Sequence, residues 1–250
     1  MTLIDAHTHV GTCQVLGANS TFEAVWAKME QYHIQTSLVQ PHPWPKEPER
    51  EHEDIANLAA KYPGRIYGMA CFNPYLEEAE YERLLKWAIR DLDFRGVKIQ
   101  TGPQALSPLH PACDKIFRLA NELHIPVMIH TGVGIPNALP SLAIPRAMEY
   151  PELPIVLAHA GANLFTTEAI VAAQICKNIY LETSWVTSFD TIPLLQKVES
   201  ERVMMGSDVP ENVASELCKY ESVEMTDHQR RQCMGKTAAT LYRLPYEDGQ

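Results

Sequence analysis

Two histidines one residue apart, His7 and His9, end the short apolar run LIDAHTHV at residues 3–10. Side chains alternate along a strand, so both imidazoles are expected on one face, with Asp5 beneath them. Neutral imidazole is the commonest protein ligand for first-row divalent cations, and a strand holds two such groups close together. The pair is a candidate metal site, although a chain with ten histidines can contain such a pair by chance.

Further ionisable residues stand near the carboxyl ends of other apolar runs: Lys98 in GVKIQT, His130 in IPVMIHTG, His159 in PIVLAHAG and Asp208 in VMMGSDVP. One strand histidine is usually explained by a hydrogen bond to a backbone carbonyl, but several strand ends with such residues are harder to explain that way. Three histidines and a carboxylate, with room for water, suit one Zn²⁺, Mn²⁺ or Fe²⁺ ion. Such an ion lowers the pKa of bound water from 15.7 toward about 7 and polarises a carbonyl.

Eight short β-branched or apolar runs must position these residues, and segments with helical spacing separate almost all of them. This alternation is typical of a parallel sheet. Capping boxes are indicated by Ser20 with Glu23 and by Thr226 with Gln229. Eight strand and helix pairs in 250 residues predict an α/β fold, a (β/α)8 TIM barrel. The strands are expected at residues 3–10, 36–42, 66–74, 96–101, 125–132, 154–161, 179–184 and 203–210.

An open, doubly wound sheet is the competing architecture. It would leave the first and last strands far apart, whereas closure makes them neighbours and directs His7, His9 and Asp208 into one mouth. We therefore expect a closed barrel. No linker or break in composition divides the chain, so a single domain over residues 1–250 is predicted.

The composition argues against several functional classes. A net charge of −10 disfavours nucleic acid or an anionic membrane surface as a partner. The sequence has no run of eighteen apolar residues and no basic, apolar leader, so neither a membrane span nor a secretory signal is expected. Six cysteines without a CxxC pattern indicate reduced thiols. We expect a cytoplasmic protein that acts on a small molecule, with a homodimer as one possible assembly.

Five motifs occur in the order that is typical of the amidohydrolase superfamily: DAHTH at 5–9, GVK at 96–98, IHTG at 129–132, AHAG at 158–161 and GSDVP at 206–210. The chain most resembles the "amidohydrolase 2" group, which includes aminocarboxymuconate-semialdehyde decarboxylase, resorcylate-type decarboxylases and pyrone-dicarboxylate lactonase. The resemblance extends over nearly the whole chain and implies a barrel of the metal-dependent hydrolase type. It does not identify the substrate.

The resemblance also implies a role for each matching residue. His7, His9, His130 and Asp208 would ligate the metal. His159 would be catalytic, because it would orient or deprotonate the metal-bound water or polarise the substrate, and Asp208 could also transfer a proton. One divalent ion is favoured over two, with Zn²⁺ expected ahead of Mn²⁺ and Fe²⁺.

Lys98 and Asp5 each have two interpretations. In two-metal relatives a carboxylated lysine on the fourth strand bridges the ions, whereas a free Lys98 ammonium would bind a substrate carboxylate, which is the interpretation we favour. Asp5 either fixes the tautomer of a ligand imidazole or makes a structural hydrogen bond. Residues at strand ends or in the following loops are weaker candidates for lining the pocket: Gln40, His42, Asn73, Gln100, Thr131, Arg146, Ser184, Trp185 and Asn212.

The predicted function is a metal-dependent hydrolase that uses a metal-activated water to attack a carbonyl of a small, carboxylated molecule, such as a lactone or an amide. The alternative is a metal-dependent, non-oxidative decarboxylase of an unsaturated or aromatic carboxylic acid, because both reactions can use the same ligands. A third hypothesis is a barrel that binds a metabolite without turnover, although such a protein would need no metal-ligand set.

Overall fold

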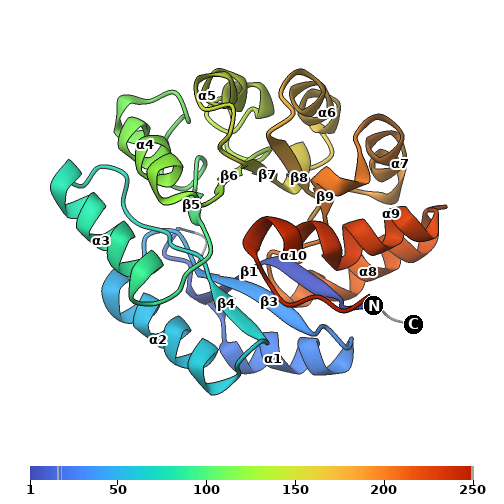
Figure 1. Cartoon of the computed structure of the whole chain (residues 1–250), viewed down its shortest axis with the longest axis horizontal. Coiled ribbons are helices and arrows are strands. Elements are labelled where there is room, and N and C mark those ends of the chain that lie inside the picture. The colour runs from blue at the N-terminus through green and yellow to red at the C-terminus, as the bar shows by residue number, and fades with distance from the viewer. Residues whose placement is uncertain (16, 18, 249–250) are drawn as a thin grey trace.

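Eight parallel strands surround a central axis in the computed structural model, which describes residues 1–15, 17 and 19–248. A two-residue strand, β2 (Asn19–Ser20), pairs antiparallel with the end of the first barrel strand. Figure 1 shows the strands in chain order around the molecule. The barrel strands are β1 (Ile4–Thr12), β3 (Thr36–Pro41), β4 (Ile66–Gly68), β5 (Val97–Ile99), β6 (Val127–His130), β7 (Ile155–Ala158), β8 (Ile179–Glu182) and β9 (Val203–Met204).

Backbone hydrogen bonds at two seams close the barrel. The first joins β1 to the chain after β9, where Thr8 bridges Asp208 and the Asp208 N–H donates to the His7 carbonyl at 2.7 Å. The second joins β4 to β5, where Ala70 bridges Val97. The first and last strands are therefore neighbours, so the predicted (β/α)8 barrel is confirmed and the open sheet is wrong.

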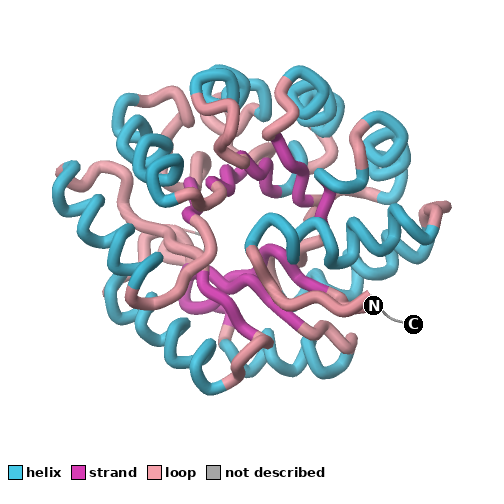
Figure 2. Tube along the Cα trace, viewed as in Figure 1, coloured by secondary structure: helices cyan, strands magenta, loops and turns pink. Residues whose placement is uncertain are grey.

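Helices form the outer layer, and each barrel strand is followed by one of them. Figure 2 shows the strands near the centre and the helices outside them. Among the described residues, no helix has both the length and the apolar character needed to cross a membrane. The helices are α1 (Phe22–Gln31), α2 (Pro48–Lys61), α3 (Glu78–Arg90), α4 (Asp114–Leu123), α5 (Ile144–Glu149), α6 (Thr166–Ile175), α7 (Ser188–Lys197), α8 (Val213–Ser222), α9 (Asp227–Arg231) and α10 (Thr237–Tyr242).

Alternation along the strands separates an outer core from the barrel interior. On β6, Val127 and Ile129 belong to the large cluster between sheet and helices, whereas Met128 belongs to a second cluster with residues of α10. That second cluster fills the floor of the barrel. A residue in phase with Met128 and nearer the carboxyl end, such as His130, therefore points toward the opposite end of the interior, the mouth.

Two local expectations were tested by the structure with different outcomes. Thr226 and Gln229 form the predicted capping box of α9. The box predicted at Ser20 and Glu23 is wrong, because Ser20 lies in β2 and the Thr21 side chain caps α1 by accepting from the Ala24 N–H. Neighbouring hydroxyl residues compete for a cap, and pairing of Ser20 with β1 decides between them.

Candidate active site

His7 and His9 on β1 and Asp208 after β9 bring three ligand atoms together at the closure seam. His7 Nε2 lies 3.3 Å from His9 Nε2, and each nitrogen lies 3.4 Å from Asp208 Oδ1. Two ligand atoms that are each about 2.0–2.2 Å from one ion lie about 3.0–3.5 Å apart. The nearly equilateral triangle therefore has the dimensions of one face of a metal site.

Hydrogen bonds fix the tautomers of His7 and His9. His7 Nδ1 lies 2.7 Å from Glu182 Oε2, and His9 Nδ1 lies 3.0 Å from the Pro41 carbonyl oxygen. A carboxylate and a carbonyl can only accept, so each Nδ1 carries the proton and donates. The Nε2 atom of each neutral imidazole consequently carries a lone pair.

The same reasoning applies to His130 and His159. His130 Nε2 donates to the Val133 carbonyl at 2.6 Å, which leaves the lone pair on Nδ1. The Ser184 hydroxyl donates to Glu182 Oε2 at 2.9 Å, so it accepts from His159 Nδ1 at 2.7 Å. The lone pair of His159 is therefore on Nε2, which lies 3.1 Å from His130 Nδ1.

Four imidazole lone pairs thus face one another in two pairs without a proton between them. Burial lowers the pKa of His7 and of His159 well below the usual value, and burial together with the Lys98 charge lowers that of His130 to about 4. The rings of His7, His130 and His159 are therefore neutral at pH 7. A divalent cation between His7 Nε2 and His9 Nε2 would accept both of their lone pairs, so the donor set fits a metal ion.

Asp208 supplies the negative charge of this set. Burial opposes ionisation of its carboxyl group, but the polar interactions of that group within the histidine cluster outweigh burial and hold its pKa well below the usual value. Its backbone has a φ of +65° and that of His159 a φ of +66°, both in the left-handed region. His159 directly follows β7, whereas Asp208 lies beyond the end of β9, at the bridge to Thr8. Left-handed backbone at a non-glycine residue costs about 1–3 kcal/mol and is concentrated at functional sites.

Glu182, at the end of β8, orients two of the histidines and is absent from the sequence-based candidates. It is fully buried, and its Oε2 accepts from His7 Nδ1, the Ser184 hydroxyl and, at 3.2 Å, the His159 N–H. Gly206 leaves room for this arrangement, since a Cβ there would lie 2.6 Å from Glu182 Oε1. The sequence contains a signal for Glu182, because alternation puts it on the same face of the strand as Tyr180, which faces the barrel interior.

The Asp5 carboxylate hydrogen-bonds to backbone N–H groups and a hydroxyl, and not to an imidazole ring as one of its two interpretations requires. Its Oδ1 accepts from the N–H groups of Ser207 at 2.9 Å and His7 at 3.2 Å, and its Oδ2 accepts from the Ser207 hydroxyl at 2.6 Å. The prediction that Asp5 fixes an imidazole tautomer is therefore wrong, and the alternative, a structural hydrogen bond, holds. A register shift between Asp5 and Thr8 interrupts the alternation that the prediction assumed.

Lys98 and two glutamines add polar groups beside the histidines. The buried Lys98 ammonium donates to His7 Nε2 at 3.0 Å, and burial lowers its pKa to about 8. Gln40 Nε2 donates to His9 Nε2 at 3.2 Å. Gln100 is two residues beyond Lys98 on the same face of the chain, and its buried Nε2 has no partner among the described residues. The mouth thus contains a buried cation, and Gln100 offers an unused donor on the same face of the chain.

The weaker candidates divide into two groups. His42 stacks on His9 with ring centroids 4.7 Å apart, and Trp185 Nε1 donates to Asp208 Oδ2 at 2.8 Å, so both touch the histidine cluster. The structure places others in supporting contacts. Arg146 pairs with Asp114 and Glu149, Asn73 accepts from the Tyr75 N–H, Asn212 donates to Glu216, and Thr131 donates to the Ala158 carbonyl.

Solved structures of similar fold match nearly the whole chain. An uncharacterized TIM-barrel protein from Bordetella bronchiseptica has a TM-score of 0.79 at 15% identity, with 96% of this chain and 98% of that chain covered. A 2,6-dihydroxybenzoate decarboxylase from Rhizobium gives 0.75 at 15%, covering 97% and 99%. A 5-carboxyvanillate decarboxylase from Novosphingobium aromaticivorans, with manganese and 4-hydroxy-3-methoxy-5-nitrobenzoic acid, gives 0.77 at 16%, covering 97% and 96%.

Sequence comparison identifies the family. Among curated proteins no match is found. The family model described as Amidohydrolase matches residues 4–244, which include every candidate ligand. The chain belongs to the amidohydrolase family.

Proposed function

We propose that the protein is a metal-dependent, non-oxidative decarboxylase of a small, planar carboxylic acid. The observation that carries this proposal is the buried Lys98 ammonium, which donates to a candidate metal ligand, together with the unpartnered Gln100 Nε2 two residues further along the same face of the chain. The decarboxylases of similar fold act on aromatic acids, and one of them contains manganese. These likenesses support the proposal and make Mn²⁺ the first metal to test, ahead of the Zn²⁺ expected from the sequence.

The Lys98 ammonium is the reason to expect a carboxylate substrate. A pKa of about 8 leaves this buried group mostly protonated at pH 7, and the acceptor that the structure gives it is His7 Nε2. A cation bound to the triangle of His7, His9 and Asp208 would be ligated by the lone pair of His7 Nε2. The ammonium would then need another acceptor, because an unpaired buried charge is costly. A substrate carboxylate could accept from both Lys98 Nζ and Gln100 Nε2.

Decarboxylation replaces CO₂ with a proton at the same carbon. The bond to the carboxyl carbon breaks, its electron pair stays on the ring carbon, and that carbon takes up one proton. A bound divalent ion would supply positive charge that stabilises negative charge on the substrate. Lys98 and Gln100 would orient the carboxylate. Asp208 and the Nε2 atom of His159 would hold or transfer the proton.

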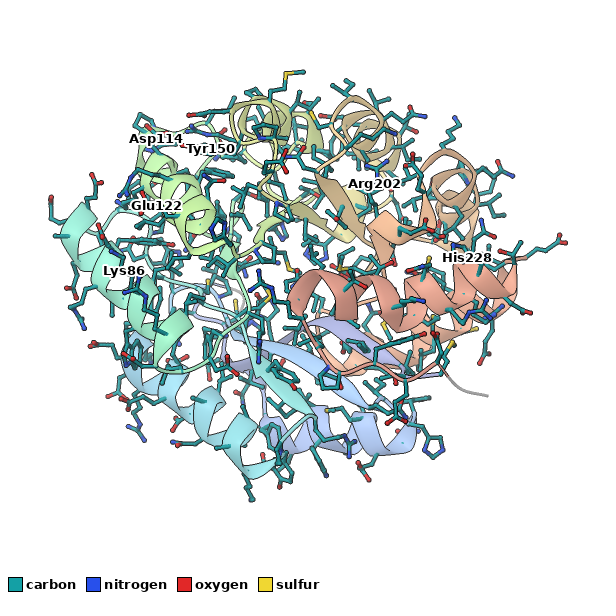
Figure 3. All side chains as sticks on the ribbon, viewed as in Figure 1. Lys86, Asp114, Glu122, Tyr150, Arg202 and His228 are labelled. Carbon is teal, nitrogen blue, oxygen red and sulfur yellow. The ribbon has the colours of Figure 1, made fainter. Side chains whose placement is uncertain are left out.

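The test is a substrate screen with Mn²⁺-loaded protein. We expect CO₂ release from a member of a panel of hydroxylated benzoic and muconate-type acids, and no hydrolysis of matched lactones and amides. Lys98→Met should raise KM about 10- to 100-fold, since a hydrogen bond to a charged group contributes about 1.5–3 kcal/mol. Lys86→Met is the matched control, because Lys86 lies on α3, outside the barrel (Figure 3).

Hydrolysis of a carbonyl compound is the second candidate, and the family itself favours it, since the matching model is described as Amidohydrolase. The neutral His159 has an Nε2 lone pair that could accept a proton from water. Turnover of a lactone or amide without CO₂ release would reject the decarboxylase and support this reaction. A mass increase from carboxylation of Lys98, together with two bound ions, would reject its role as a free ammonium.

A further inference from the structure

The turn after β8 carries an aromatic side chain directly onto a candidate metal ligand. Trp185 Nε1 donates to Asp208 Oδ2 at 2.8 Å, while Asp208 Oδ1 faces His7 Nε2 and His9 Nε2. The two oxygens of one carboxylate therefore have different neighbours. A carboxylate without such a donor can rotate and offer both oxygens to an ion.

Packing alone does not hold the Trp185 ring in this position. The residue is 47% exposed, and an open groove of about 510 Å³ lies beside it, lined in part by Val186, Ser188 and Cys218. An exposed ring next to open space can adopt other rotamers. The hydrogen bond to Asp208 therefore has a large share in fixing the indole.

The backbone of Trp185 is fixed more firmly than its ring. Its φ of +64° lies in the left-handed region, which is unusual for a bulky residue. The Trp185 N–H donates to Glu216 Oε1 at 2.8 Å, and the buried Glu216 pairs with Lys219. Lys219 Nζ in turn donates to the Thr183 carbonyl at 2.6 Å. A buried ion pair on α8 thus holds both sides of the turn.

The same network reaches the backbone next to Asp208. Asn212 Nδ2 donates to Glu216 Oε1 at 2.9 Å and to the Ser207 carbonyl at 3.1 Å. Trp185 and Asp208 are therefore tied to the same buried carboxylate through separate bonds. Glu216 on α8 and the preceding Asn212 therefore help to fix the relative position of Trp185 and Asp208.

We infer that Trp185 is a positioning residue, whose indole N–H holds Asp208 Oδ2 so that Oδ1 alone is directed at the metal. Without this bond the carboxylate rotates, and both the affinity for the ion and its coordination change. The inference rests on the proposed metal site but not on the reaction that the site catalyses.

The test compares Trp185→Phe with Trp26→Phe in metal-free protein titrated with Mn²⁺. Phenylalanine keeps an aromatic ring and removes the N–H. We expect Trp185→Phe to weaken Mn²⁺ binding about 10- to 100-fold, as is typical when a hydrogen bond to a metal ligand is lost. The visible absorption of the Co²⁺-loaded variant should change in the direction of a higher coordination number. Trp26→Phe, on α1, should bind both ions as the wild type does.

An unchanged Mn²⁺ affinity and Co²⁺ spectrum in a folded Trp185→Phe variant would overturn the inference. Circular dichroism establishes folding, which the exposure of Trp185 makes the expected result. His7→Ala, titrated in parallel, separates the two claims. If His7→Ala also binds normally, the metal assignment fails; if only Trp185→Phe binds normally, the positioning role alone fails.

Discussion

His7→Ala is expected to lose the metal and the activity together. The substitution removes the Nε2 lone pair that lies 3.3 Å from His9 Nε2 and 3.4 Å from Asp208 Oδ1. It also removes one hydrogen-bond partner of the buried Glu182. A metal ion supplies several kcal/mol of charge stabilisation, so the rate should fall about 1,000-fold or more. Elemental analysis and steady-state kinetics on the same preparation measure both effects.

His228→Ala is the matched control for this variant. His228 lies on α9 at the outside of the molecule and pairs with Glu201 (Figure 3). It should retain metal, activity and the rise in Tm that a bound ion produces. Since His7→Ala could be unstable, the melting temperatures of both variants without metal are needed, and His9→Ala provides a second route to the same loss. Full metal content in folded His7→Ala would contradict the assignment.

His159→Asn is expected to keep the metal and lose turnover. The asparagine side chain can still donate to the Ser184 hydroxyl, but it has no imidazole nitrogen to accept or release a proton near pH 7. General acid or base catalysis typically contributes about 100- to 10,000-fold, so kcat should fall by a factor in this range. Metal content should stay close to that of the wild type, because the triangle of His7, His9 and Asp208 is intact.

The outcome of this experiment also decides how His159 acts. An unchanged kcat would reject a catalytic role. A loss of metal would make His159 a ligand, which its Nε2 lone pair and its distance of 3.1 Å from His130 Nδ1 would permit. His110→Asn is the control, since the His110 side chain caps a short helix by accepting from the Ala112 N–H.

The fold was predictable because the apolar runs and the helical segments alternate with little ambiguity. The ends of the strands were not predictable. The sixth barrel strand was expected to continue to Gly161, but this strand, β7, ends at Ala158. His159 turns the chain through a left-handed backbone, which neither propensity nor periodicity indicates for histidine. This turn matters to the site, because Ala158 faces the barrel interior and strict alternation would direct His159 away from it.

The part of the site that was predictable consists of ionisable residues at the ends of apolar strands. His7, His9, Lys98, His130, His159 and Asp208 were identified because ionisable groups are conspicuous in apolar runs. Glu182 was missed, although it ends the strand IYLE in phase with the inward-facing Tyr180. Glu182, and not Asp5, contacts the His7 imidazole and fixes its tautomer. The register shift in β1 that turns Asp5 away cannot be predicted from the alternation of side chains. Tautomers depend on hydrogen-bond partners distant in sequence, so only the structure supplies them.

We expect the lone pairs of His7, His9 and His130 and one oxygen of Asp208 to surround a single divalent ion. Anomalous diffraction at the manganese edge, from crystals of Mn²⁺-loaded protein, tests this assignment most directly. We predict one peak about 2.0–2.3 Å from His7 Nε2, His9 Nε2 and Asp208 Oδ1, with His130 Nδ1 directed at it. A Mn²⁺ ion found elsewhere would contradict this assignment, and so would a Lys98 ammonium that still donates to His7 Nε2 in metal-saturated crystals.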